Sequence, residues 1–252
     1  GFSSESEISL KSGSVVMKHL NGDHFQTHKV IIAQNEWTYI DNDGKLFAID
    51  KNDFSVLLPS GKLTFDAVFN AIHGAPGENG QLQSYFDLVG MPYTGCSSYA
   101  SALTFNKRDC IAALKPFDIP AATSYYLNQG DTIDVTAILD TVGLPCFVKA
   151  NCSGSSFGVT KVYKSSDMTA AIEVAFKEGS EVLIESFLDG IEVSVGVIRY
   201  QDEVLVLPAT EIVSENDFFD YEAKYLGKSE EITPARLTPL QLTNLNTLAK
   251  KV

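Results

Sequence analysis

The sequence has few of the features that would place a protein in a membrane or on a nucleic acid. It contains no run of about 18 apolar residues, so no membrane-spanning helix is expected. Basic residues are scarce, because 19 Lys and Arg stand against 32 Asp and Glu. The resulting net charge of −13 would repel nucleic-acid phosphates. The first residues also lack the basic and apolar regions of a secretory signal peptide. These absences favour a cytoplasmic protein with neither a membrane nor a nucleic-acid partner.

Metal-binding patterns are absent as well. The four cysteines form no C-x-x-C pair, which favours reduced thiols over a zinc site. Three of the four histidines, His19, His24 and His28, lie in a polar turn region, where solvated imidazoles are more common than metal ligands. No metal ligand is therefore assigned.

Helix and strand patterns alternate along the 252 residues, a length that fits one large domain or two to three small ones. Helices are predicted at 5–20, 81–90, 106–117, 134–143, 165–179 and 238–251. Strands are predicted at 29–34, 37–41, 65–72, 123–128, 144–150, 160–164, 181–188, 192–200 and 203–212.

The order of these elements favours an α/β fold. The predicted buried strand 65–72, a glycine loop and a helix ending at Gly90 suggest a parallel α/β unit. Farther on, the last two predicted strands form a hairpin through Gln201-Asp202. Ser165 or Ser166 is expected to cap the helix that ends at Gly179. Residues 214–237 have no clear period and are expected to form a long ordered loop.

The segment His73–Gly80, "HGAPGENG", is a glycine-rich loop between an apolar and an amphipathic run. It is either a connector or a place where backbone approaches a ligand. A second such loop, "NCSGSSFG", follows Lys149 at the end of a predicted strand. Its backbone N–H groups and hydroxyls suit phosphate oxygens, although it lacks the order of a Walker A loop. A flexible β-turn is the alternative.

Two further groups have both a functional and a structural explanation. Glu185 and Glu192 lie near a strand end, where carboxylates can accept hydrogen bonds from an adenine amino group and a ribose. They can equally be solvated edge charges. The segment Tyr221–Tyr225 combines a lysine with two tyrosines, and its aromatic rings can simply anchor a loop.

Together these stretches resemble the D-alanine–D-alanine ligases of the ATP-grasp superfamily. "SSESEISLKSG", "HGAPGENGQLQ", "KANCSGSSFGV", "VLIESFLDGIEVSV" and "FDYEAKY…ITPA" occur in that family's order, and the resemblance spans Gly1 to Val252. It implies an ATP-grasp fold of the α/β class with three parts: an N-terminal parallel α/β substrate domain (1–103), a central α+β subdomain (104–188) and a partial C-terminal subdomain (189–252).

The resemblance implies a two-step reaction in which ATP phosphorylates one D-alanine and the amine of a second D-alanine then displaces phosphate, giving a peptidoglycan precursor. It assigns ATP binding to Lys107, Lys149, Ser155, Ser156, Glu185, Phe187, Leu188, Glu192, Phe218 and Lys224. It assigns substrate binding to Glu5, His73, Gly74 and Tyr225, with Glu5, Ser155 and Tyr225 as the catalytic, loop-closing trio. Glu78 is expected to brace the first glycine loop.

The same resemblance leaves some features outside these residues. The Mg²⁺ ligands of the family are expected beyond Val252, and the chain is expected to be part of a longer enzyme. A homodimer is expected because family members are commonly dimeric. Two alternatives stay open: another ATP-grasp carboxylate–amine ligase, or a truncated nucleotide-binding module without catalysis.

Overall fold

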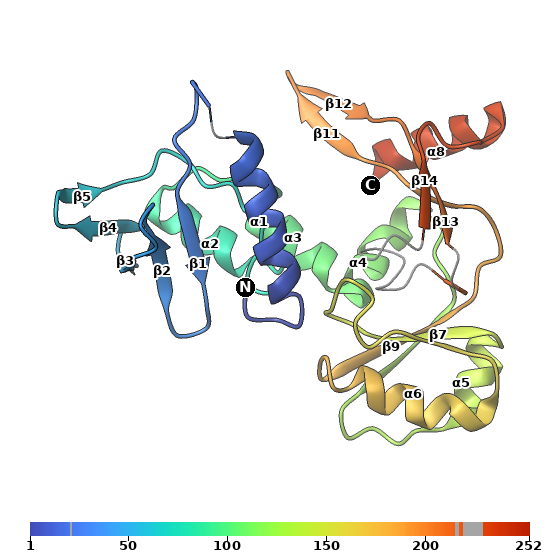
Figure 1. The fold of residues 1–252 in the computed structure, drawn as a ribbon. Coiled ribbons are helices and arrows are strands. Elements are labelled where there is room, and N and C mark those ends of the chain that lie inside the picture. Colours follow the sequence, from blue (N-terminus) through green and yellow to red (C-terminus); the bar gives the residue numbers. More distant parts are fainter. Residues whose placement is uncertain (21, 215–216, 219–228) are drawn as a thin grey trace. The chain divides into compact units, whose positions relative to one another are not determined.

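The computed structural model describes residues 1–20, 22–214, 217–218 and 229–252, and it divides into two compact units, Gly1–Asn106 and Lys107–Val252 (Figure 1). Each unit contains both helices and strands and has its own buried core. Within the described residues, no helix is both long and apolar enough to cross a membrane. The predicted mixture of helices and sheets is confirmed.

The first unit contains three helices and one five-stranded sheet. Its elements are α1 (Ser6–Leu20), β1 (Lys29–Ile32), β2 (Trp37–Ile40), β3 (Leu46–Asp50), β4 (Ser55–Leu58), β5 (Gly61–Leu63), α2 (Gln81–Val89) and α3 (Ser98–Phe105). The strands lie in chain order, β1-β2-β3-β4-β5, and every neighbouring pair is antiparallel. Short turns can join antiparallel strands, whereas parallel ones need long crossovers. The sequence predicted a parallel α/β unit here, whereas this sheet is antiparallel throughout.

The predicted strand at 65–72 is wrong. This segment is extended, but its ladder pairing is one parallel bridge between Val68 and Tyr93. Val68 donates to Pro92 O at 2.8 Å and accepts from Thr94 N at 2.9 Å. The run is also not buried along its length, since Phe69 is 53% exposed. Its apolar residues serve the core individually instead: Phe65, Val68 and Ile72 pack against it.

Aromatic side chains dominate the core of the first unit. Trp37 and Tyr85 meet edge-to-face at 4.8 Å, and Phe54 meets Phe86 at 5.1 Å. These pairs join the sheet to α2, and edge-to-face contacts of this kind add to the stabilisation that burial provides. Helix α2 ends at Gly90, as predicted, in the left-handed conformation. Helix α3, capped by Ser97, was not predicted.

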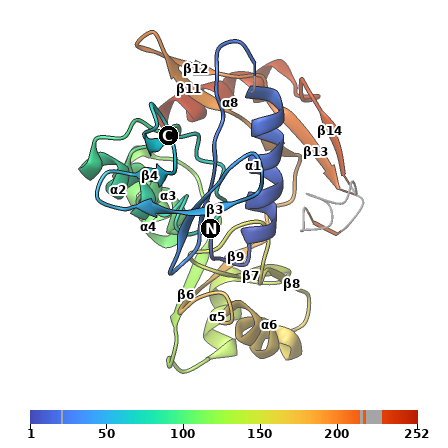
Figure 2. The ribbon, with the colours of Figure 1, turned by 60° about the vertical axis from the view of Figure 1, so that its left-hand side comes forward.

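The second unit begins at α4 (Lys107–Leu114), which continues into a 3₁₀ turn at Lys115–Phe117. Its four-stranded antiparallel sheet has the order β6-β9-β7-β8, formed by β6 (Ser124–Asn128), β7 (Cys146–Ala150), β8 (Thr160–Val162) and β9 (Glu181–Ser186). Helices α5 (Val135–Val142) and α6 (Met168–Ala175) cover one face of this sheet (Figure 2).

The side chains of strand β7 alternate between the core and the other face of this sheet. Cys146, Val148 and Ala150 are buried in the core, and Phe147 and Lys149 alternate with them and are only partly buried. Because successive side chains of a strand point to opposite faces, the same strand that builds the core also presents Phe147 and Lys149 on the face away from α5 and α6.

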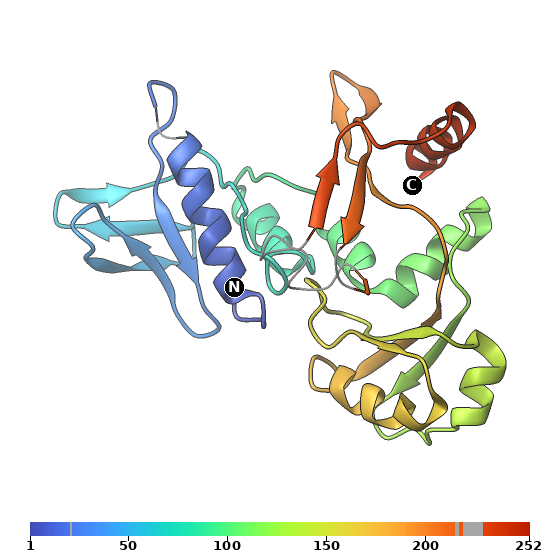
Figure 3. The ribbon, with the colours of Figure 1, turned by 45° about the vertical axis from the view of Figure 1, so that its right-hand side comes forward.

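The other described elements of the second unit form smaller sheets and a final helix. Strands β10 (Glu192–Ser194), β13 (Thr210–Ser214) and β14 (Ser229–Ile232) form one sheet, and β13 and β14 lie side by side in Figure 3. Strands β11 (Val197–Tyr200) and β12 (Glu203–Val206) form the predicted hairpin through Gln201 and Asp202, both at positive φ. Helix α8 (Pro239–Lys251) lies in the predicted range and is capped by Thr238.

Three predictions in this unit need correction. The predicted hairpin 192–212 is interrupted, because β10 pairs with β13 and leaves only β11 and β12 in the turn. Part of the predicted loop 214–237 is strand β14, which pairs with β13. Helix α6 begins at Met168 after a 3₁₀ turn and ends at Ala175, and no side chain caps its first turn.

The buried carboxylate of Glu211 connects the β10-β13-β14 sheet to the segment that precedes α8. Glu211 on β13 accepts hydrogen bonds from the backbone N (3.1 Å), Nε (2.9 Å) and terminal nitrogen (2.6 Å) of Arg236. These bonds lower the pKa of Glu211 to about 2. The carboxylate therefore stays ionised near neutral pH, where it pairs with the guanidinium.

Candidate functional site

A cavity of about 300 Å³ lies in the second unit, between the face of β7 that points away from the helices and the loop that follows this strand. We call it the glycine-loop cavity. Its lining residues are Lys107, Phe147, Lys149, Ala150, Ser153, Gly154, Ser155, Ser156, Phe157, Val159, Glu192 and Phe218. Six of the predicted ATP-binding residues are among them: Lys107, Lys149, Ser155, Ser156, Glu192 and Phe218. A seventh, Glu185, does not line the cavity but forms an ion pair with Lys149.

Lys149 and Glu185 lie on one face of adjacent strands. Glu185 is opposite Phe147 in the β7–β9 register, and Lys149 lies two residues farther along β7. The ammonium of Lys149 pairs with the Glu185 carboxylate, and both side chains are largely buried. A buried, paired ammonium at the edge of a cavity is suited to an anionic ligand, because little solvent competes for its charge.

The loop after β7 makes a tight turn at Gly154–Phe157. Phe157 N donates to Gly154 O at 3.0 Å, and the two central residues, Ser155 and Ser156, have φ of 48° and 61°. Positive φ is unfavourable for residues other than glycine, and strained backbone of this kind concentrates at ligand-binding loops. The turn therefore supports the predicted role of the Ser155-Ser156 backbone at a phosphate.

Lys107 reaches the same loop from the first residue of α4. Its Nζ donates to Ser153 O at 2.5 Å and to Asn151 O at 3.2 Å, and its backbone N donates to Asn151 O at 3.3 Å. These contacts hold a second ammonium at the cavity wall. Lys107 and Lys149 thus give the glycine-loop cavity two ammonium groups.

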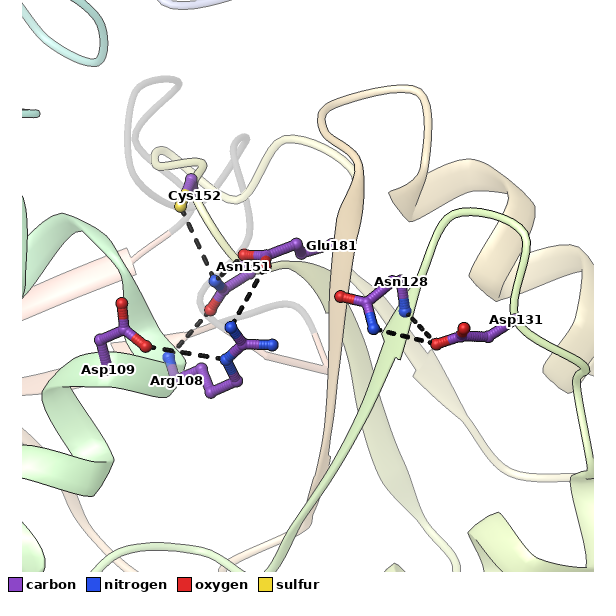
Figure 4. Close-up of polar contacts among 7 residues, drawn as sticks. All are labelled: Arg108, Asp109, Asn128, Asp131, Asn151, Cys152 and Glu181. Atoms are coloured by element: carbon purple, nitrogen blue, oxygen red, sulfur yellow. Dashed lines mark hydrogen bonds and ion pairs between the residues drawn. The ribbon is translucent and has the colours of Figure 1, made fainter.

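Asn151, which the sequence did not single out, joins three elements around this cavity (Figure 4). It is 1% exposed. Its Oδ1 accepts from Arg108 N at 2.8 Å, so it caps α4 from the end of another element. Its Nδ2 donates to Glu181 Oε2 at 2.7 Å, and Arg108 pairs with the other oxygen of Glu181 at 3.3 Å. The network fixes Lys107 relative to β7 and β9.

Replacing Asn151 with alanine is expected to lower the free energy of unfolding by about 1–3 kcal/mol, because buried polar partners lose their hydrogen bonds. Urea denaturation measures this change. Asn128→Ala is the control, because the Asn128 side chain donates one hydrogen bond, from Nδ2 to Asp131 Oδ2 at 3.1 Å, at an exposed site (Figure 4). Its loss is expected to cost only about 0.5 kcal/mol. Equal losses for the two variants would contradict the role of Asn151.

Aromatic rings also line the cavity. Phe218 packs edge-to-face on Phe147 at 5.3 Å, and Glu192 at the start of β10 adds a carboxylate. Phe187 lies 6.2 Å from Phe147 but does not line the cavity among the described residues, and Leu188 is 68% exposed. The cavity therefore has both cationic and aromatic lining residues, as a nucleotide requires.

Three of the four predicted substrate residues, Glu5, His73 and Gly74, lie in the first unit. Helix α1 presents Ser9 and Ser12 to the first glycine loop: His73 N donates to Ser9 Oγ at 3.0 Å, and His73 Nε2 lies 2.8 Å from Ser12 Oγ. Gly74 N donates to Glu78 Oε2 at 2.7 Å, which confirms the predicted brace.

Glu5 lies just before α1 and is 3% exposed. A Cβ on Gly74 would stand 2.5 Å from Glu5 Oε2, so glycine is what lets this loop and the Glu5 carboxylate approach each other. The loop glycines at 77 and 80 have a different reason. Their neighbours are Ile72 and Ser98 of the same unit, so a side chain at either position would collide with the packing of this unit.

The predicted catalytic trio stays a prediction. Glu5 belongs to the first unit and Ser155 to the second, and Tyr225 lies outside the described residues, as does Lys224. A more open hollow of about 480 Å³ in the first unit, at the end of α2, has Asp87 as its charged lining residue and lacks the lysines of the glycine-loop cavity. Among the residues that the structure describes, no group of three or more His, Cys, Asp and Glu could hold a metal ion.

Two cationic side chains, a strained glycine–serine turn and aromatic rings at one cavity are suited to a nucleotide. The fold and the family models identify the class as the ATP-grasp enzymes. Family models agree along the chain. The model described as "D-ala D-ala ligase N-terminus" matches residues 1–96, and that described as "D-ala D-ala ligase C-terminus" matches residues 114–252. The chain belongs to the D-alanine–D-alanine ligase family.

Individual relatives extend this result. The D-alanine–D-alanine ligase of Flavobacterium johnsoniae is 55% identical over 251 residues, which cover 100% of this chain and 78% of the relative. That of Christiangramia forsetii is 55% identical over 238 residues, or 94% and 73% of the two chains. The family is confirmed at a level of identity at which the fold is shared throughout the match.

Solved structures show the same fold. D-alanyl-alanine synthetase A from Vibrio cholerae superposes with a TM-score of 0.85 at 30% identity, covering 100% of this chain and 77% of that chain. The VanG D-Ala:D-Ser ligase from Enterococcus faecalis gives 0.78 at 28% identity, covering 99% and 78%. The predicted ATP-grasp fold is confirmed.

Proposed function

We propose that this chain is an ATP-dependent ligase that joins two D-alanine molecules into D-alanyl-D-alanine for peptidoglycan precursor synthesis. The observation that carries the proposal is the match of both family domains, together with 55% identity to a D-alanine–D-alanine ligase over the whole chain. The glycine-loop cavity supports it, because it offers two ammonium groups to phosphates and an aromatic wall to a base.

The reaction has two steps. A carboxylate oxygen of the first D-alanine attacks the γ-phosphorus of ATP, ADP leaves, and D-alanyl phosphate forms. The amine of the second D-alanine then attacks the carbonyl carbon, inorganic phosphate leaves with the C–O bond electrons, and the amine loses a proton. Phosphorylation turns a poor leaving oxygen into a good one, and the protein contributes mainly by positioning and charge neutralisation.

Each residue has a role in this scheme. Lys107, Lys149 and the Ser155-Ser156 backbone hold the phosphates, and Lys224 reaches the γ-phosphate. Glu185 and the Leu188 backbone bind adenine, Glu192 the ribose, and Phe187 and Phe218 the ring face. Glu5 binds the ammonium of the first D-alanine, His73 and Gly74 line its pocket, and Tyr225 completes the closed trio with Glu5 and Ser155. None of the described residues is given a role in binding Mg²⁺.

A panel of amino acids tests the proposal. ATP-dependent phosphate release, with Mg²⁺ present, is expected with D-alanine alone and not with L-alanine, and mass spectrometry is expected to identify D-alanyl-D-alanine. D-serine and D-lactate belong in the panel because one structural relative is a D-Ala:D-Ser ligase. No response to D-alanine, with turnover of another acid, would favour a different ATP-grasp ligase. No turnover at all would favour a nucleotide-binding module without catalysis.

The finer organisation is part of the same proposal. The chain has three parts: an N-terminal substrate domain, 1–103, a central subdomain, 104–188, and a C-terminal subdomain, 189–252. The enzyme is a cytoplasmic homodimer. Light scattering measures the assembly, and a monomer mass at assay concentration would remove the dimer from the proposal.

A further inference from the structure

Strand β8 and the residue just beyond it present a charged and a hydroxyl group to Asp217. Lys161 Nζ donates to Asp217 Oδ1 at 3.0 Å, and Tyr163 Oη lies 2.6 Å from both carboxylate oxygens. Lys161 Nζ also lies 3.4 Å from Asp217 O. Asp217 is thus held through both its side chain and its backbone. We call Lys161, Tyr163 and Asp217 the β8 anchor.

The Lys161 ammonium is enclosed by aromatic rings. It lies 4.2 Å from the ring centroid of Phe187, 5.3 Å from that of Tyr163 and 5.7 Å from that of Phe147, and its side chain is 7% exposed. Burial lowers its pKa, but the hydrogen bonds with Tyr163 and Asp217 outweigh that effect and raise it. The group therefore carries a full positive charge, which the ring faces and the carboxylate stabilise.

The β8 anchor is adjacent in sequence to a wall of the glycine-loop cavity. Phe218 follows Asp217 directly, lines the cavity, and packs edge-to-face on Phe147 at 5.3 Å. Its carbonyl accepts from Ser214 Oγ at 3.0 Å. Lys161 is directly opposite Phe147 in the β7–β8 register. One strand pair therefore supports both the Phe147 ring and, through Asp217, the Phe218 ring that rests on it.

We propose that Lys161 and Tyr163 are positioning residues which, through Asp217, hold Phe218 as the wall that contacts the purine base of a bound nucleotide. The inference rests on the proposed function for the presence of the nucleotide. It differs from a purely structural role in one respect: Lys161 contacts the Phe147 and Phe187 rings and Asp217, whereas Lys107 contacts the backbone of Asn151 and Ser153. Its loss therefore affects ligands that carry a base and not the phosphates alone.

Calorimetric titration of the full chain with ADP and with inorganic tripolyphosphate separates these roles. Lys161→Met is expected to weaken ADP binding by about three- to tenfold, because contacts between a base and an aromatic ring are lost when the ring is mispositioned. Tripolyphosphate binding is expected to stay unchanged. Lys161→Arg, which keeps the charge, should restore most of the ADP affinity. The exposed Lys164→Met, two residues beyond β8, is the charge-matched control and should bind both ligands as the parent does.

Each outcome decides the inference. Unchanged ADP affinity in Lys161→Met, or equal weakening of both ligands, overturns it while leaving the proposed function intact. If Lys161→Met does not fold, Tyr163→Phe takes its place, since Tyr163 is 52% exposed and its change removes one hydroxyl. A selective loss of ADP affinity in that variant supports the inference. Failure of the parent chain to bind either ligand would contradict the proposed function itself.

Discussion

Replacing Lys149 with methionine is expected to reduce D-alanine-dependent phosphate release by about a hundredfold to a thousandfold, the usual effect of removing one preorganised electrostatic partner of a reacting group. The reason lies in the alternation of β7, which buries Val148 and presents Lys149 to the cavity. Negative charge on the transferring phosphoryl group is most costly where solvent is excluded, and the Lys149 side chain is only 25% exposed. Methionine keeps the length and apolar stem of the side chain and removes its charge.

Lys149 also forms an ion pair with Glu185, so the Lys149→Met variant is expected to lose stability as well as activity. Removing the lysine leaves a mostly buried carboxylate without that partner, and a loss of about 1–3 kcal/mol of stability is expected with it. The double variant Lys149→Met/Glu185→Gln removes both charges. It should recover most of the stability and none of the activity. Initial-rate assays and urea denaturation on both variants, with Lys164→Met as control, separate the two effects. Recovery of activity in the double variant would mean that Lys149 acts only through Glu185.

The cationic residues of the cavity were predictable from the sequence because their signals are local. A lysine at the end of an apolar strand, followed at once by a glycine–serine loop, needs no long-range contact to be recognised. The structure brings Lys149, Ser155 and Ser156 to one cavity, as expected from that spacing. Lys107 lies 42 residues before Lys149, and only the family resemblance connected the two.

Asn151 and the β8 anchor could not be predicted, because their roles depend on strand register. In the sequence, Asn151 is one polar residue in a loop. Its structural role comes from its buried hydrogen bonds to α4 and β9. From the sequence alone, Lys161 would be a solvated lysine on a strand. The pairing of β8 with β7 places it opposite Phe147. Pairings between residues tens of positions apart are fixed by the whole sheet and are not visible in a local pattern.

In the first unit, by contrast, a local sequence pattern led to a wrong prediction. The apolar run at 65–72 has the composition of a buried strand, yet Val68 alone makes a ladder contact and the other apolar residues fill gaps in an aromatic core. Composition reports that side chains prefer burial, but it does not say whether a backbone partner exists. Helix α3 was missed for a related reason. Its eight residues are too short for a helical period to stand out.

The two glycines that flank α2 are expected to differ in the stability that is lost when each is replaced by alanine. Gly80 and Gly90 both have left-handed backbone, with φ of 83° and 70°. Their surroundings differ. A Cβ on Gly80 would stand 2.4 Å from the backbone oxygen of Ser98, whereas a Cβ on Gly90 would meet nothing within 4 Å. Gly90→Ala therefore reports the conformational cost alone, which we expect to be about 1 kcal/mol.

Gly80→Ala adds a steric cost that neither helix can relieve cheaply, because the atom in its way is the backbone of the residue that begins α3. Overpacking of this kind costs about 1–3 kcal/mol, so a total loss of about 2–4 kcal/mol in the free energy of unfolding is expected. Urea denaturation at one temperature measures both variants. Equal losses at Gly80 and Gly90 would show that α3 moves aside freely. A larger loss at Gly80 would show that α2 and α3 are locked together where the loop carrying His73 ends, so that this loop is held at both ends, by Ser9 on α1 and by the close approach at Gly80.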